Sequence, residues 1–241
     1  ENTDFYSSYY SGYRYQINQD WLFKTNLARE IRIPLLNEKF GDRGYTVGTE
    51  ELKPETAINA DIGFKYNLEN FSIGSAYFYR KLDDAIILIF SSQGVGKPDN
   101  ISKADIHGLE LESAFDINSN FSVLINTTIQ RAKDLSSSSS SSGKSLPGLY
   151  QREAFLSAKY RHNAFEYSLE YEYQAGGFYD SSNVEDAQLP TSKQVNLMVK
   201  WEGVGHRIEF VIDNLTDQMI QDFNRYPSPG RALSVSYAYN F

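Results

Sequence analysis

The chain has 241 residues, enough for one large β domain or two small domains, and its formal net charge at pH 7 is −8. That charge argues against nucleic acid as a partner, because binding to phosphates needs a basic face. The sequence contains no cysteine, which excludes a disulfide framework and thiolate metal sites within it. The mean hydropathy is −0.48 and no run of about 18 apolar residues is present, so no helix is expected to span a membrane.

The first five residues have neither the basic start nor the apolar run of a signal peptide. We therefore expect that such a segment has been removed, or that the chain is the later part of a longer protein.

Aromatic residues are abundant, with 18 Tyr and 15 Phe, and large apolar residues alternate with small or polar ones along much of the chain. In the clearest segment, Phe165, Tyr167 and Leu169 alternate with Glu166 and Ser168. Such alternation predicts a strand with one apolar and one polar face. The pattern predicts about eleven strands, at 5–17, 21–27, 58–66, 71–79, 109–115, 121–129, 156–160, 165–173, 195–201, 208–212 and 233–241. No segment predicts a convincing helix.

The predicted connections alternate between short and long. Short turns fall near residues 18, 68, 118, 163 and 204, and long connections span 30–56, 81–103, 134–150, 175–191 and 214–230. All short turns then lie at one end of the strands, which is typical of a transmembrane barrel with short periplasmic turns and long external loops. We predict an all-β fold, an antiparallel transmembrane β-barrel with a periplasmic C-terminus. A soluble antiparallel barrel is the alternative.

Two long connections have unusual composition. The apolar patch from Ile86 to Phe90 either extends a strand or folds over its loop. Seven consecutive serines, Ser136 to Ser142, predict a flexible loop tip that could not sit inside a packed core.

Four segments resemble motifs of the TonB-dependent receptors, the gated importers of the Gram-negative outer membrane. They are Leu27-Ala-Arg-Glu-Ile-Arg-Ile-Pro34 with Asn37-Glu38, Leu52-Lys-Pro-Glu-Thr56 leading into Asn59 and Ile62-Gly63, Ile106-His-Gly-Leu-Glu110, and Asp213-Asn-Leu-Thr-Asp217 with Tyr226-Pro-Ser-Pro-Gly-Arg231 and a terminal aromatic. They occur in the family's order, and the resemblance covers nearly the whole chain.

The resemblance implies that residues 1–241 are the C-terminal portion of a 22-stranded barrel. The family's plug domain and TonB box have no counterpart in the sequence, so the chain is expected to be a fragment or to close as a smaller barrel. The expected location is the outer membrane, crossed many times. The implied partners are the TonB complex (through a plug), outer-membrane lipid, lipopolysaccharide and the barrel assembly machinery, whose end signal resembles Tyr239 with Phe241.

The resemblance also implies energised uptake of a scarce nutrient complex, a ferric siderophore before cobalamin or haem. Haem receptors of the family usually place a histidine within the segment that corresponds to residues 35–51, which has none. A passive porin and an outer-membrane barrel enzyme remain as alternatives. An enzyme would need a nucleophile and base at adjacent strand ends. The one histidine near the external rim, His107, follows Asp105 but has no serine in such a context, so we expect no catalytic residue, cofactor or metal site.

Candidate binding residues are the aromatic and arginine side chains of the long loops, because these groups suit a flat, anionic iron chelate. They are Arg32, Arg43, Tyr45, Phe178, Tyr179, Phe223, Arg225 and Tyr226. A second set, on the polar parity of the strands, is expected to line a lumen or hold a plug. It comprises Glu166, Glu170, Glu172, Lys200, Arg207 and Glu209.

Overall fold

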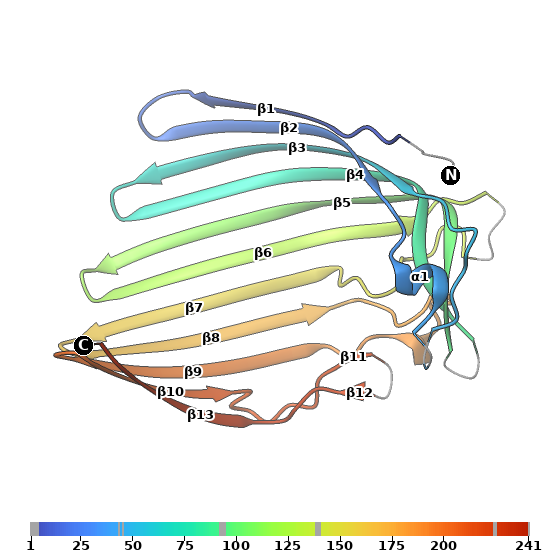
Figure 1. Cartoon of the computed structure of the whole chain (residues 1–241). Coiled ribbons are helices and arrows are strands. Elements are labelled where there is room, and N and C mark those ends of the chain that lie inside the picture. The colour runs from blue at the N-terminus through green and yellow to red at the C-terminus, as the bar shows by residue number, and fades with distance from the viewer. Residues whose placement is uncertain are drawn as a thin grey trace.

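The computed structural model describes residues 5–42, 44, 46–91, 95–137, 141–223 and 226–240, without the side chains of Phe90, Ser102, Asp222, Phe223, Tyr226 and Pro227. Eleven strands form one antiparallel sheet, with each strand paired to its neighbour in the chain (Figure 1). The strands are β1 (Tyr9–Gln16), β2 (Trp21–Arg32), β3 (Glu55–Leu68), β4 (Phe71–Phe90), β5 (Gly96–Asn118), β6 (Phe121–Asp134), β7 (Arg152–His162), β8 (Phe165–Ala175), β9 (Ser192–Gly203), β10 (His206–Asp213) and β13 (Ala232–Tyr239). The predicted all-β fold and its eleven strands are confirmed.

The register keeps the two predicted faces separate across the whole sheet. In an antiparallel pair, residues directly opposite each other point to the same side. Leu169 of β8 lies opposite Ala158 on one side and Leu197 on the other, whereas Glu166 lies opposite Arg161 and Lys200. The sheet therefore has an apolar face and a polar face, and we keep these two names below.

The five short turns occur where the sequence predicts them. In two of them an asparagine side chain forms the turn, because Asn18 and Asn118 each accept hydrogen bonds from two following backbone N–H groups. Two others use a residue with positive φ, Asn163 at 52° and Gly205 at 73°. Asparagine and glycine tolerate this conformation, which explains why such short turns fit here.

The opposite end of the sheet carries all the long connections and the small elements. These are the helix α1 (Leu36–Phe40), the 3-10 turn η1 (Glu185–Ala187) and the two-stranded hairpin of β11 (Gln221–Phe223) and β12 (Tyr226–Pro227). The sequence predicts none of them. No helix in the described part of the chain is long and apolar enough to cross a membrane.

The predicted loop at 81–103 is wrong, because β4 and β5 continue as a paired hairpin far beyond the rest of the sheet. They have 20 and 23 residues and remain paired from Phe71↔Phe115 to Phe90↔Gly96. Asp84 has a φ of 53°, and the buried side chains change parity there, from Leu82 to Ala85. The change lets the hairpin bend and bury apolar residues, so the apolar patch extends the strand.

A small core forms where these long segments meet the polar face of β3–β6. Ala57, Leu82 and Ala104 lie side by side in the sheet, and Leu146 from the following loop packs against them. Small residues at this level leave room for the loop. The long-loop end of the sheet is thus covered, while the rest of the polar face stays open.

The prediction that the serine tract stays out of the packed structure is wrong for two of its described residues, Ser136 and Ser141, whereas Ser137 and Ser142 are exposed. Ser136 and Ser141 are buried, and both donate hydrogen bonds to the carboxylate of Asp134, Ser136 from its N–H and Ser141 from its hydroxyl. A buried carboxylate needs such donors, so the serines organise the start of this loop.

Strands β1 and β13 are the edges of the sheet, and they are not paired with each other in the described residues. Each has a neighbour on one side only, β2 and β10. An open edge leaves a row of backbone donors and acceptors available for another strand.

Gly108 of β5 marks the tightest backbone approach in the sheet. A Cβ there would lie 2.4 Å from the carbonyl oxygen of Ile129 and 2.8 Å from the Phe78 ring. We expect Gly108→Ala to destabilise the folded protein by about 1–3 kcal/mol, because backbone must move. The denaturant midpoint of the intact protein in lipid vesicles measures this. Gly74→Ala is the matched control, since its Cβ would meet no atom closer than 3.7 Å. An equal loss in both variants would contradict the explanation.

Candidate functional site

The six residues predicted to line a lumen all lie on the polar face. Lys200 is opposite Glu166 on β8 and Glu209 on β10, and Arg207 is opposite Glu202. Parity along each strand predicts this arrangement, and the register of the sheet agrees with it.

At the short-turn end, four of the polar-face charges form one cluster. The Arg161 guanidinium donates to Glu166 at 2.7 Å, and the Lys200 ammonium lies 3.7 Å from Glu166 and 3.5 Å from Glu202. Because these charges are partly exposed, the cluster fixes side-chain positions more than it stabilises the fold.

Towards the middle of the strands, the polar face carries carboxylates without cationic partners in the described residues. Glu170 and Glu172 form no ion pair in the described part of the chain, and Glu172 accepts only a long hydrogen bond from the Asn196 amide, 3.4 Å. Glu110 and Glu112 of β5 lie on the same face, as their pairing with β6 shows. Neither residue is among the sites predicted from sequence, although the parity of β5 places both on the polar face.

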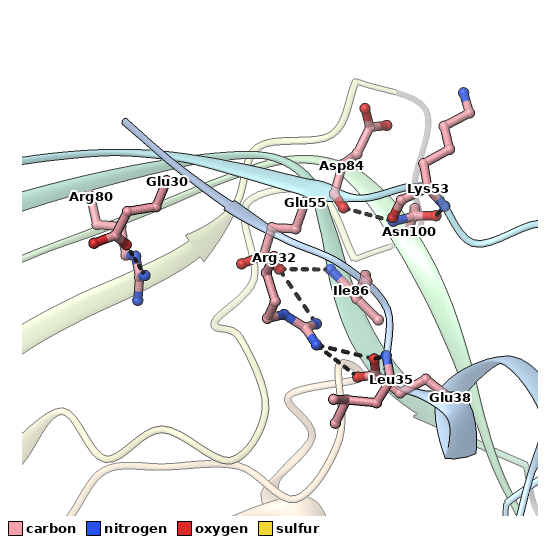
Figure 2. A network of polar contacts seen from close by, with 10 residues as sticks. All are labelled: Glu30, Arg32, Leu35, Glu38, Lys53, Glu55, Arg80, Asp84, Ile86 and Asn100. Carbon is pink, nitrogen blue, oxygen red and sulfur yellow. Dashed lines mark hydrogen bonds and ion pairs between the residues drawn. The ribbon is translucent and has the colours of Figure 1, made fainter. Parts of the chain in front are cut away.

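At the long-loop end, Arg32 closes a network that ties the start of the β2–β3 loop to the hairpin of β4 and β5 (Figure 2). Its guanidinium bonds to Glu38 of α1 at 3.0 Å and lies 3.7 Å from Glu55. Glu55 also accepts a hydrogen bond from the Ile86 N–H, 3.0 Å. In the structure the guanidinium of Arg32 lies between the carboxylates of Glu38 and Glu55, and its predicted contact with a ligand stays a prediction.

Further contacts brace the same loop against the hairpin. The Asn100 amide bonds to both backbone groups of Lys53 and to the carbonyl of Asp84, and the Thr49 hydroxyl donates to the Pro98 carbonyl at 2.6 Å. The loop is therefore held in one position, while the apolar side chains of Leu36 and Phe40 on α1 stay exposed.

A cavity of about 360 Å³ lies beside this network. Its lining combines charged side chains with apolar surface and comprises Ser8, Glu30, Ile31, Arg32, Glu55, Ala57 and Arg80. Glu30 accepts a hydrogen bond from Asn59 at 2.7 Å. It accepts a second one from Arg80 at 3.3 Å (Figure 2). Of this set, only Arg32 is predicted from sequence. The other charged residues are far apart in the sequence, and only the pairing of the strands brings them together.

Phe178 and Tyr179, also predicted as binding residues, lie between two long loops and are half-buried. Phe178 bridges to Gln188, and its carbonyl accepts a hydrogen bond from the Gly148 N–H. The Tyr179 hydroxyl donates to Gln221 at 3.3 Å. These contacts join the loops before β7, β9 and β13, and a ligand role for the two rings stays a prediction.

The positions of the other predicted binding side chains are not described. Arg43, Tyr45 and Arg225 lie outside the described residues, and the side chains of Phe223 and Tyr226 are not described. Of the predicted end signal, Tyr239 packs against the His206 ring at 4.8 Å, and Phe241 lies outside the described residues.

The three histidines of the sequence lie at different places in the sheet. His162 and His206 are beside short turns, and His107 lies on the apolar face 3.3 Å from Asp105. The described residues contain no group of three or more His, Cys, Asp or Glu that could hold a metal ion.

Comparison with known proteins shows which family the eleven-stranded sheet belongs to. The family model described as TonB dependent receptor-like, beta-barrel matches residues 1–215. A comparison with curated proteins found no match.

Several solved structures share the fold. The copper transporter OprC superposes with a TM-score of 0.77 at 16% identity over 96% of this chain and 39% of its own. The siderophore receptor PirA from Pseudomonas aeruginosa superposes with a TM-score of 0.70 at 18% identity, over 97% of this chain and 40% of its own. The ferric yersiniabactin uptake receptor FyuA from Yersinia pestis superposes with a TM-score of 0.70 at 20% identity, over 97% of this chain and 37% of its own. This chain thus spans about two fifths of the proteins that it resembles, and at these identities the likeness concerns the fold.

We expect Glu55→Ala to release the β2–β3 loop from the hairpin, because the Ile86 N–H loses its acceptor and Arg32 loses one of the two carboxylates beside it. Hydrogen bonds to a charged group contribute about 1.5–3 kcal/mol, so the amides of Val47, Thr49 and Lys53 should exchange at least roughly ten-fold faster. Hydrogen exchange on the intact protein measures this. Glu51→Ala, an exposed carboxylate of the same loop, is the control and should leave exchange unchanged. Unchanged exchange in Glu55→Ala would show that other contacts hold the loop.

Proposed function

The chain belongs to the TonB-dependent receptor family through its β-barrel domain, and we propose that it forms part of the wall of an outer-membrane receptor for the energised uptake of a ferric siderophore. The family comprises receptors and transporters rather than enzymes, which confirms the prediction that the chain is not an enzyme.

The observation that carries the proposal is the two-faced wall with interlocked loops at one end. Exposed side chains such as Leu109, Ile129 and Leu169 cover the apolar face, which suits lipid, and charged rows cover the polar face, which suits a lumen. Such a sheet cannot stay open in a bilayer, because the unpaired groups of β1 and β13 would lack hydrogen-bond partners. In the proposed receptor, both edges pair with strands from the remainder of the protein.

The polar face gives the proposed lumen its electrostatic character. The carboxylates of Glu110, Glu112, Glu170 and Glu172 suit basic groups of a plug inside the barrel, since opposite charges within a water-poor space attract strongly. Energy would then reach the receptor from the TonB complex through that plug.

The proposed cargo follows from the chemistry of the long-loop end and from the names of the similar structures. The cavity beside Arg32 and Arg80 offers guanidinium and carboxylate groups together, which suit the mixed polar groups of an iron chelate. Among the similar structures are the siderophore receptor PirA and a ferric enterobactin receptor from Pseudomonas aeruginosa. The short turns are proposed to lie in the periplasm, together with the C-terminus, and the long loops outside.

Deletion of the intact gene tests the proposed uptake. We expect the deletion strain to stop growing under iron limitation when one ferric siderophore is the only iron source, and to grow normally with excess inorganic iron. Parallel cultures that depend on cobalamin or on haem distinguish the two other cargo classes. Loss of growth only in the cobalamin or the haem culture would identify that compound, and not a siderophore, as the cargo. Normal growth in every culture would contradict uptake of all three cargo classes.

A further inference from the structure

The hairpin of β4 and β5 has two edges where it extends beyond the rest of the sheet (Figure 1). The chain itself covers the β5 edge, because the β2–β3 loop runs along it and the Val47 N–H donates to the Gly96 carbonyl at 2.9 Å. On the β4 side, the pairing with β3 ends at Thr56↔Asp83. Beyond this point the second edge of the hairpin has no neighbouring strand among the described residues.

One hydrogen bond shows which backbone groups of β4 point away from β5. The Ile86 N–H donates to the Glu55 carboxylate at 3.0 Å, so it points outward (Figure 2). Backbone groups alternate in direction along a strand, so the N–H and carbonyl of Leu88 point the same way. Pro98, opposite Leu88, agrees with this, because proline has no N–H and the Pro98 carbonyl accepts from Thr49 on the far edge.

We call the outward backbone of residues 86–90 the β4 edge. The Glu55 carboxylate takes one of its donors, and no backbone group of the described residues bonds to it. From Ala85 to Phe90 the sequence has no charge and no proline, the residues with which natural edge strands prevent further pairing. Such an aliphatic run has a high propensity to pair with another strand. The β4 edge is therefore suited to an added strand.

The connection that leads into β1 approaches from the side that the β4 edge faces, the side of β3, β2 and β1. β1 begins at the long-loop end, where Arg29 donates to the Ser7 carbonyl at 2.6 Å. Ser8 and Glu55 line one cavity, and Glu55 bonds to the β4 edge. Only this cavity thus separates the start of β1 from the open edge.

We propose that an extended segment of the connection upstream of residue 1, which leads into β1 in the intact receptor, adds a strand to the β4 edge. Main-chain hydrogen bonds supply the affinity in such an addition, and the aliphatic side chains on both faces of the edge strand supply apolar contacts. The added strand would fix a loop of the remainder of the receptor beside the cavity that Arg32 and Arg80 line.

The proposal rests on the proposed function, in which further strands of the receptor precede β1. This chain spans about two fifths of the proteins that it resembles, so a receptor of their length has residues for such a connection.

Photo-crosslinking in whole cells tests which segment occupies the β4 edge. The intact receptor carries benzoylphenylalanine in place of Leu88, and mass spectrometry of the peptides identifies the crosslinked residues. We expect a crosslink to the connection upstream of residue 1, in a band of monomeric mass. The control carries benzoylphenylalanine in place of Lys97, an exposed residue of β5, whose edge is already covered. It should give no crosslink to that connection.

The other occupants of the edge would give different products. A crosslink from residue 88 to a second copy of the receptor or to another protein would overturn the proposal. A crosslink only to residues 5–240, no crosslink at all, or an equal crosslink from residue 97 would overturn it as well.

Hydrogen exchange on the intact receptor tests the backbone pairing. Leu88→Pro removes an outward N–H but leaves Ile87 and Ile89, whose N–H groups point to β5, so the amides of the upstream connection should exchange roughly ten-fold faster. Leu88→Ala keeps the N–H and should leave their exchange unchanged. Heat-modifiable migration in gels checks that both variants fold. Equal exchange of the connection in the two variants would contradict the added strand.

The added strand and the proposed uptake fail separately. Loss of growth in the deletion strain without a crosslink from residue 88 would refute the added strand alone. A crosslink to the upstream connection, together with normal growth of the deletion strain in every culture, would support the added strand and refute the uptake alone.

Discussion

The backbone register between neighbouring strands is the constraint on which the rest of the structure depends. One register runs from β1 to β13, and it keeps residues such as Leu169 on the apolar face and Glu170 on the polar face. A slip by one residue would exchange the two faces of a strand and place charges in hydrocarbon. The same register brings the carboxylates of Glu110, Glu112, Glu170 and Glu172 to the polar face, so it also creates the proposed lumen surface.

The strands and short turns of the sheet could be predicted from sequence because their signals lie within a few residues of one another. A strand in this environment must alternate at every second residue, and a short turn needs residues such as Asn18 or Gly205. Both signals lie within a few residues, so eleven strands and five turns are found without any knowledge of their partners. Parity also assigns Glu166 and Lys200 to the polar face before their contact is seen.

The long-loop end could not be predicted, because its contacts join residues that are far apart in the chain. Asn100 fixes Lys53, and Asn183 bonds to the backbone of Ser145. Arg32 shows the consequence for the candidate site. Its residue type predicts a ligand contact, but only the fold shows that Glu38 and Glu55 lie beside its guanidinium. The bend at Asp84, a non-glycine residue with positive φ, likewise has no clear signal in the sequence.

Site-directed spin labelling along β8 tests most directly whether this chain is a lipid-facing wall. Single labels at residues 165–173 of the intact receptor in lipid vesicles would report collisions with oxygen, which enters the bilayer, and with a water-soluble nickel chelate. Labels at odd positions, such as Leu169, should collide more with oxygen, and labels at even positions, such as Glu170, more with nickel. Equal accessibility at both parities, or the reverse order, would contradict the membrane-spanning wall.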